Sequence, residues 1–317
     1  MTKRIFSLLL ALCLALPLSL IQVTAAEAGV ATVEGVTLHV GATLEARFYL
    51  SAPTNSLEVG VLVDGMRYEG KRGEDGRWIV PFKGIAATEM CKTYEIVPYY
   101  FVTRRVTGEG CRFSVQDYAM RLLEKEETPD ATKTALKALL NFGAQCLLNG
   151  TEKYDALPNE FLSEEDRVIP EGVYESHFTF EGEGGVAGGY EDTMISVSFV
   201  KSLQLRVSAD ISETLEEAVR LEIADNPAFE NSRRYEMKKN SKTGAYEATV
   251  EGLYLNALSR PFYIRINRGD VRGKTFTYSV ESYCHEIFLP DTSIVTTAAK
   301  KTFAHAMMAL SRALNAM

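Results

Sequence analysis

The sequence contains an internal repeat, and this repeat restricts the fold more than any other feature. Residues 76–97 align without gaps onto residues 244–265. Identity is low, but a later block, 113–118, aligns with 278–283 in the same order. Matched positions include Gly76 with Gly244, Trp78 with Tyr246, Gly84 with Gly252 and Ile96 with Ile264. We therefore interpret the chain as one structural plan present twice, as in a duplication.

Each copy begins with a strand-rich part. β-Branched and aromatic residues, partly alternating with polar ones, are typical of half-buried strands. Gly-containing turns such as Asp64-Gly65 separate these runs. In the first copy the pattern predicts strands at 36–50, 57–63, 78–82 and 94–103.

Each copy ends in two predicted amphipathic helices. In the first copy Ser114 is a hydroxyl cap for one helix, and Thr128-Pro129-Asp130 has the composition of a helix start. An apolar stripe from Leu136 to Leu147 follows, and the second copy closes with a similar stripe from Phe303 to Met317. The pattern predicts an α+β fold of two tandem strand-rich, β-sandwich-like domains, each ending in two helices.

The predicted boundaries divide the chain into four parts. Residues 1–25 form a signal peptide and residues 26–150 the first strand-rich repeat with its helices. Residues 151–175 are polar, contain two prolines and an acidic run, and are interpreted as a linker or a surface strap. Residues 176–317 form the second repeat with its helices.

The N-terminal segment has the three parts of a secretory signal. Lys3 and Arg4 precede an apolar run from Ile5 to Ile21, and Val23 and Ala25 occupy the −3 and −1 positions of a signal-peptidase site. We expect cleavage near Ala25 and a secreted or cell-surface-associated protein. No later apolar segment is long enough to span a membrane, so no integral membrane segment is expected after cleavage.

The charge of the chain disfavours a nucleic-acid partner. The formal net charge of −8 becomes −10 when the two cations Lys3 and Arg4 leave with the signal peptide. Nucleic-acid binding needs a basic face, which this balance does not favour. Short basic pairs such as Arg104-Arg105 are interpreted as solvated loop or edge-strand charges.

The cysteines leave two interpretations open. Cys13 lies within the apolar run of the signal; lipidation there is disfavoured by the large Leu12 before it. Cys91 and Cys111 flank a predicted strand pair, and a disulfide between them is one possibility in an exported chain. Cys146 and Cys284 fall in predicted helices, where a buried thiol behaves as a small apolar residue.

Two helical motifs carry a resemblance to known proteins. The segment 114–123 reads SVQDYAMRLL, and 135–145 reads ALKALLNFGAQ. They resemble the "SVxDYA" and "VKALLNYGA" helices of a repeat module in exported and cell-surface proteins of anaerobic Gram-positive gut bacteria. The closing part, with Tyr278–Tyr283 and the terminal helix, resembles the companion copy. The resemblance implies placement outside the cell and a fold; it transfers no catalytic residue.

A glycine-rich segment between predicted strands contains the one unusual acidic cluster. Glu181, Glu183, Glu191 and Asp192 surround five glycines. Carboxylates on a flexible loop suit a hard cation such as calcium, although the order of an EF-hand is missing. The alternative is an ordinary glycine-rich connection between strands. No cofactor is predicted.

Three aromatic residues are candidates for ligand contact. Trp78, Tyr99 and Tyr100 could form a flat platform on which a sugar ring stacks. The alternative is that they pack in the core or in turns, because aromatic residues are favoured in strands whatever the function. Trp78 aligns with Tyr246 of the other copy, which fits the second interpretation.

No motif in the sequence indicates catalysis. The four histidines show no metal-ligand spacing, and no G-x-S-x-G elbow is present. We expect a non-catalytic module that binds an extracellular glycan or protein. The alternatives are a structural spacer of the cell surface and an extracellular hydrolase of a class the motifs do not reveal.

Overall fold

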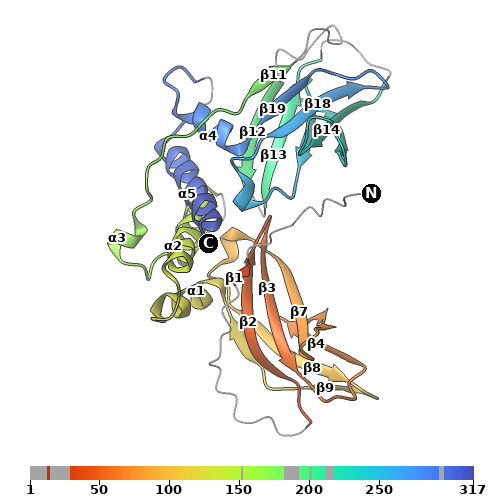
Figure 1. Ribbon diagram of the computed structural model, residues 1–317, viewed down its shortest axis with the longest axis vertical. Helices are drawn as coiled ribbons and strands as arrows, with labels where there is room; N and C mark the ends of the chain where they lie inside the picture. Colours follow the sequence, from red (N-terminus) through yellow and green to blue (C-terminus); the bar gives the residue numbers. More distant parts are fainter. Residues whose placement is uncertain are drawn as a thin grey trace, which may run out of the picture.

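The protein has an α+β fold in which antiparallel sheets pack beside a layer of helices (Figure 1). The computed structural model describes residues 13–14, 29–150, 153–181, 193–199, 202–211, 217–292 and 296–317. We refer to residues 29–150 as the N-terminal half and to residues 176–317 as the C-terminal half. Within the described ranges, no helix has the length and apolarity needed to cross a membrane.

The N-terminal half contains two antiparallel sheets. The first has the order β1 (Cys13–Leu14), β2 (Thr32–Val40), β3 (Leu44–Ser51), β7 (Trp78–Ile85), β6 (Lys71–Arg72). The second has the order β10 (Cys111–Phe113), β8 (Tyr94–Phe101), β4 (Glu58–Val63), β5 (Met66–Glu69), with β9 (Arg105–Thr107) also paired to β8. Rings from the two sheets meet edge-to-face, with the Phe48 and Phe113 centroids 5.6 Å apart. The sheets therefore fit a β-sandwich, whose core lies between them.

The C-terminal half repeats the order of four strands in each sheet, and β1, β9 and β11 (Thr179–Glu181) have no counterpart among the described strands of the other half. One sheet is β12 (Thr193–Phe199), β13 (Leu203–Ala209), β17 (Tyr246–Val250), β16 (Lys238–Lys239). The other is β11 (Thr179–Glu181), β19 (Thr275–Tyr278), β18 (Phe262–Arg268), β14 (Val219–Ala224), β15 (Arg233–Glu236). Register agrees as well: Val63 pairs with Ile96 in the first half, and Ile223 pairs with Ile264 in the second. The Ile96–Ile264 match in the sequence thus corresponds to equal positions in the two sheets.

The strands follow the predicted runs except at 36–50. That run is two strands rather than one, because the chain reverses at Gly41, whose N–H donates to the Thr43 carbonyl at 3.1 Å. In β3 every second residue is buried, as expected of a strand with one face on the core.

The short helices α1 (Val115–Glu124) and α4 (Val280–Phe288) begin in the same way. Ser114 Oγ accepts the Asp117 N–H at 3.0 Å, and Ser279 Oγ accepts the Ser282 N–H at 3.0 Å. These contacts confirm the predicted hydroxyl cap at Ser114. Each helix is preceded by a short 3₁₀ turn and by strands: η1 (Ala87–Glu89), β8, β9 and β10 precede α1, and η2 (Leu255–Ala257), β18 and β19 precede α4.

The long helices α2 (Asp130–Asn149) and α5 (Ala298–Asn315) have different starts. Thr297 Oγ1 caps α5 by accepting the Lys300 N–H at 3.2 Å. The expected cap at Thr128 is wrong in detail, because Pro129 occupies the N-cap position and makes no side-chain contact there. The Thr128 hydroxyl is buried and has no hydrogen-bond partner among the residues that the structure describes.

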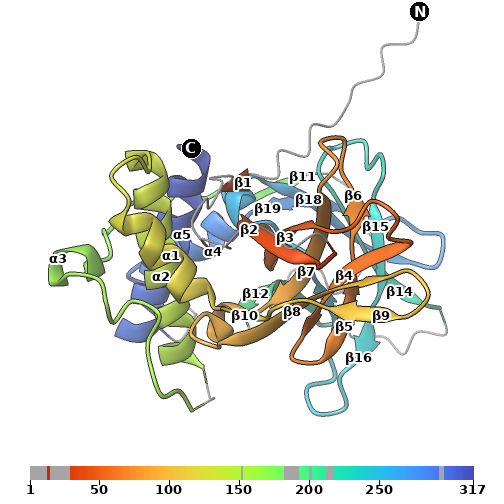
Figure 2. The same ribbon diagram turned by 90° about the horizontal axis from the view of Figure 1, so that it is seen from below.

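The two long helices come from different halves and pack against each other (Figures 1 and 2). Phe142 of α2 and Phe303 of α5 have ring centroids 5.9 Å apart. The buried apolar residues of both halves form one continuous cluster. The helix layer is therefore a shared core, to which each half contributes one apolar helix face.

A buried carboxylate stabilises the second sheet of the C-terminal half. Glu222 of β14 is 2% exposed and accepts four side-chain hydrogen bonds. The donors are Arg265 Nε at 2.7 Å, Asn267 Nδ2 at 2.9 Å, Ser232 Oγ at 2.6 Å and Arg234 Nε at 3.2 Å. Burial alone would raise the pKa of Glu222, but the four donors outweigh it and hold the pKa at about 2.

Replacing this carboxylate should destabilise the protein and change its acid sensitivity. We expect Glu222→Gln to lower the free energy of unfolding by about 3 kcal/mol, because Arg265 loses its buried partner. In the wild type the contribution of Glu222 is present above its ordinary pKa of 4.5 and is lost as the pH falls toward 2. Urea unfolding measured across this range should show a weaker pH dependence in the variant.

The matched control is Glu236→Gln, which removes an exposed carboxylate from β15. It should leave both the unfolding free energy and its pH dependence close to the wild type. Equal effects of the two substitutions would contradict the stabilising role assigned to the Glu222 cluster.

Candidate functional site

The segment between the two halves packs against the helix layer. It passes along α2, crosses α5 and α4, and then enters β11 (Figure 1). We call residues 163–178 the strap. Its contacts with the helices fall into three groups, each made mainly by polar atoms.

The first group fixes the strap to α2. Ser163 Oγ accepts the Asp166 N–H at 3.1 Å and starts the single-turn helix α3 (Glu164–Arg167). Lys137 Nζ of α2 lies 2.7 Å from Asp166 Oδ1, and Asn141 Nδ2 donates to the Asp166 carbonyl at 2.8 Å. The hydrogen bond from Lys137 lowers the pKa of Asp166 below its ordinary value. One acidic residue is therefore held through both its side chain and its backbone.

The second group anchors Tyr174, which is 4% exposed and is the one buried residue of the strap. Its ring packs against Phe288 of α4 and His305 of α5, with centroid distances of 5.5 Å to each. Its hydroxyl lies 2.5 Å from His305 Nδ1, and its carbonyl lies 2.8 Å from His285 Nδ1. Burial raises the pKa of Tyr174 to about 12, so the phenol stays protonated at neutral pH.

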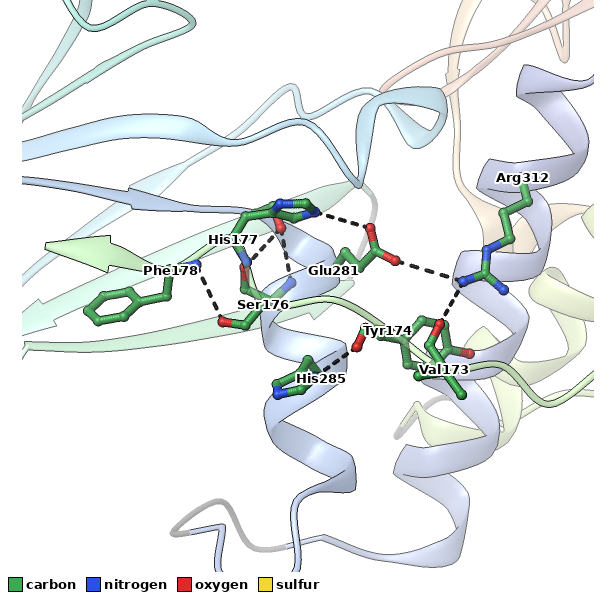
Figure 3. Close-up of polar contacts among 10 residues, drawn as sticks. Val173, Tyr174, Ser176, His177, Phe178, Glu281, His285 and Arg312 are labelled. Atoms are coloured by element: carbon green, nitrogen blue, oxygen red, sulfur yellow. Dashed lines mark hydrogen bonds and ion pairs between the residues drawn. The ribbon is translucent and has the colours of Figure 1, made fainter.

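The third group surrounds the buried carboxylate of Glu281 at the start of α4 (Figure 3). His177 Nε2 of the strap lies 3.5 Å from Glu281 Oε2, and Arg312 Nη2 of α5 lies 3.8 Å from Glu281 Oε1. Arg312 Nη2 also donates to the Val173 carbonyl at 3.0 Å. Farther along, the His177 N–H donates to Ser282 Oγ at 2.8 Å. The strap is thus held to both helices of the C-terminal half.

Between α2, α5 and the strap lies a cleft of about 440 Å³. Its floor is made of small residues, since alanines face it from both helices: Ala138, Ala306, Ala309 and Ala313. Its rim carries charges of both signs, from Lys137, Arg312, Glu165, Asp166 and Glu171. Small side chains on a helix pair leave room that larger ones would fill. The result is an apolar floor with polar groups around it, the usual composition of a binding site.

The two cations of the cleft are already held by partners within the protein. Lys137 is paired with Asp166, and Arg312 is bound to the Val173 carbonyl and lies near Glu281. Fixed cations of this kind orient a ligand well. Over the described ranges, no three His, Cys, Asp or Glu side chains lie close enough together to hold a metal ion.

The three aromatic residues proposed as a platform do not share a surface. Trp78 lies on β7 of the first sheet, whereas Tyr99 and Tyr100 lie on β8 of the second. Tyr99 is 1% exposed, and its hydroxyl accepts Arg67 Nε at 3.0 Å. The Tyr100 hydroxyl donates to the Gly29 carbonyl at 2.8 Å, and both Trp78 and Tyr100 pack partly against the core. Successive residues of a strand point to opposite faces, which separates the two tyrosines.

The predicted acidic cluster falls mainly in a part of the chain without structural description. Glu181 ends β11, and Glu183, Glu191 and Asp192 lie outside the described residues. The interpretation of this segment as a cation site or a simple connection stays a prediction.

Cys91 and Cys111 are free thiols in the structure. Cys91 Sγ lies 3.8 Å from the Ala156 carbonyl, while Cys111 is on β10 beside a small apolar cavity that also includes Phe113. Burial raises the pKa of Cys91 to about 11 and also raises the pKa of Cys111. Both thiols are therefore protonated, and neither is activated as a nucleophile. Cys146 and Cys284 are buried in α2 and α4, as predicted.

Comparison with known proteins adds no relative: no protein-family model matches the chain, and no curated protein is significantly similar to it. The site must be judged from its own residues. Sequence reasoning identified the segment as a linker or strap but did not find the cleft. The available signal was Tyr174, an aromatic residue in an otherwise polar stretch.

Removing the Tyr174 ring should loosen the strap. We expect Tyr174→Ala to lower the unfolding free energy by about 3 kcal/mol, in line with loss of a buried aromatic side chain. Limited proteolysis should then cut within residues 163–178 much faster than in the wild type.

Tyr174→Phe is the control, because it keeps the ring and removes only the hydroxyl contact with His305. It should cost about 1 kcal/mol and leave the rate of strap cleavage near the wild-type value. Rapid cleavage of both variants would show that the hydroxyl, and not ring burial, holds the strap.

Proposed function

We propose that the protein is an exported, non-catalytic module that binds an extracellular glycan or protein in the cleft between α2, α5 and the strap. The observation that carries this proposal is the cleft itself, about 440 Å³ with an alanine floor and a charged rim. A volume of this size suits a short ligand segment. The rim cations Lys137 and Arg312 are held within the protein, which supports orientation of a ligand more than proton transfer to it.

The chemistry of the cleft favours a segment of protein over a sugar. Tyr174 is the one aromatic residue among its described lining residues, and its ring is covered by Phe288, His305 and Arg312. A pyranose ring therefore has no free aromatic face to stack on. Small apolar floors with polar groups at the edge suit aliphatic side chains of a peptide.

We further propose that the mature chain consists of two duplicated domains, residues 26–150 and 176–317, joined by the linker 151–175. The order of four strands shared by the sheets of the two halves and the equal positions of α1 with α4 and of α2 with α5 support this. The same plan supports the resemblance to the repeat module of exported bacterial proteins. Its members' placement at the cell surface is consistent with the secretory signal.

A second candidate function is that of a rigid spacer at the cell surface. The observation that favours it is the packing of α2 against α5, which fixes one half against the other through a continuous core. A spacer needs this rigidity and does not need the cleft. Ligand screening separates the two candidates.

Filling the cleft should abolish binding without unfolding the protein. The mature protein would be screened against mucin, plant and host glycans, cell-wall polymers and panels of extracellular proteins. We expect Ala309→Trp to weaken the binding of any ligand found in this screen at least about tenfold, because the indole occupies the floor of the cleft. Circular dichroism and thermal unfolding would verify that the fold is kept.

Ala299→Trp is the matched control, since it adds the same side chain at an exposed position of the same helix. It should bind as the wild type does. Equal binding by Ala309→Trp would place the ligand elsewhere, and the absence of any ligand in the screen would favour the spacer.

Export can be tested independently of binding. Expressed with its natural N-terminus in a secreting bacterial host, the protein should be recovered from the medium or cell surface with Ala26 as its first residue. Mass spectrometry of the intact protein measures this directly. Retention in the cytoplasm with residues 1–25 still attached would contradict the predicted signal peptide.

A further inference from the structure

We propose that the strap is an acid-sensitive latch, in which protonation of His305 releases residues 171–174 from α5 and opens the cleft. The inference rests on the proposed function, because it gives the ligand site a means of regulation. Its structural part, the release of the strap, can be tested without any ligand.

Of the four histidines of the chain, one belongs to the strap and two contact it from the helices; the fourth, His39, lies on β2. His177 belongs to the strap itself, His285 faces it from α4 and His305 faces it from α5. Histidine is the side chain whose charge changes most readily between about pH 5 and pH 8. The three respond differently to a proton because their hydrogen-bond roles differ.

His305 is held in a role that only the neutral ring can fill. The Gly172 N–H points at His305 Nδ1 at 3.3 Å, and the Tyr174 hydroxyl lies 2.5 Å from the same nitrogen. A backbone N–H can only donate, so Nδ1 must carry its lone pair. Protonation puts a hydrogen on Nδ1. The His305 Nδ1–H and the Gly172 N–H are then two donors that point at each other, and the hydrogen bond between them is lost.

The contact is close enough for such a change to move the strap. A side chain at Gly172 would place its Cβ 2.7 Å from Arg312 Nη1, so the backbone passes directly over α5. The repelled N–H belongs to the strap backbone, so displacement of the segment relieves the contact.

Burial, more than the surrounding charges, opposes a proton on His305. From the strap it faces Glu171 and the Tyr174 hydroxyl, and from α5 it faces Arg312. Burial lowers the pKa of His305 most; the Glu171 charge raises it, and the Arg312 charge lowers it by less. Both side chains are largely exposed, so water screens both charges.

The remaining charged groups nearby are engaged with other partners. On α5, Lys301 lies over the Phe288 ring, which in turn packs 4.5 Å from His305. On α4, Glu281 lies between His177 and Arg312, and His285 contacts the Tyr174 carbonyl. On α2, Lys137 is paired with Asp166.

Of the other two histidines, His285 contacts the Tyr174 carbonyl within the released segment, and His177 keeps the remainder of the strap attached. His285 Nδ1 faces a carbonyl, so it donates in both its neutral and its charged form. A proton on His177 strengthens its contact with Glu281. The His177 carbonyl also accepts Thr277 Oγ1 at 2.6 Å. Acid therefore loosens 171–174 while the strap stays fixed at 176–178.

The direction of the pH dependence follows from the lowered pKa. The open strap has a His305 with its ordinary pKa of 6.5, and the closed strap has a lower one. The open state therefore binds the proton more tightly. Stabilisation of the closed strap is complete above pH 6.5 and is lost as the pH falls through the pKa of the closed state.

Hydrogen exchange measured by mass spectrometry on the mature protein tests the latch. Peptides within residues 163–178 would be compared at about pH 7.5 and about pH 5, after correction for intrinsic exchange, with β3 as internal reference. We expect protection at 171–174 to fall about tenfold or more on acidification, while β3 is unchanged. The midpoint should coincide with the His305 titration followed by NMR.

The decisive variant is His305→Asn, whose amide oxygen accepts the Gly172 N–H and does not titrate. It should keep strap protection nearly constant across this pH range. His285→Asn is the control, because its amide can still donate to the Tyr174 carbonyl; its pH dependence should match the wild type. If His305→Asn is unstable, the wild type alone tests the latch: the pH midpoint of strap protection must coincide with the midpoint of the His305 titration followed by NMR.

Three outcomes would overturn the latch: constant strap protection in the wild type, a pH dependence that persists in His305→Asn, or its loss in His285→Asn. These results are separate from the ligand screen. If the strap opens in acid but the screen finds no ligand, the latch is supported and the proposed binding function is contradicted. A ligand bound equally at both pH values, with a strap that does not move, does the reverse.

Discussion

The packing of α2 against α5 is the interaction on which the rest of the structure depends. Each helix has an apolar stripe that its own sheets cover only in part, and the two stripes meet across the halves at Phe142 and Phe303. This contact makes one continuous core from two sets of sheets. It also sets the floor of the cleft, because alanines at the edge of the same helix pair leave space that larger residues would fill.

Much of the fold could be predicted because its signals are local. Alternation along β3 and hydroxyl caps such as Ser114 act over a few residues. Two local details were not predicted: the chain reverses at Gly41, and Pro129 takes the place expected of Thr128. The burial of Glu222 could not be foreseen, since its donors come from two segments of the chain, 232–234 and 265–267, that are distant from it in sequence.

The candidate site was harder to predict because no single segment contains it. The cleft joins α2, the strap and α5, and its residues look ordinary in sequence: alanines on helices and charges in a polar linker. The aromatic residues that looked functional turned out to be distributed over two sheets, with Tyr99 inside a polar network with Arg67. Aromatic character reports burial in a strand as readily as it reports a binding surface.

The strap can move without unfolding the protein because of what holds it. Tyr174 is its one buried residue, and its other contacts are hydrogen bonds and ion pairs at the surface of the helices. Such contacts exchange with water at a net cost of about 0.5–1.5 kcal/mol each, whereas opening the α2–α5 core would expose many apolar side chains at once. Local opening therefore lies well below global unfolding in free energy. A single proton on His305, placed beside the one apolar anchor, acts where the strap resists release most.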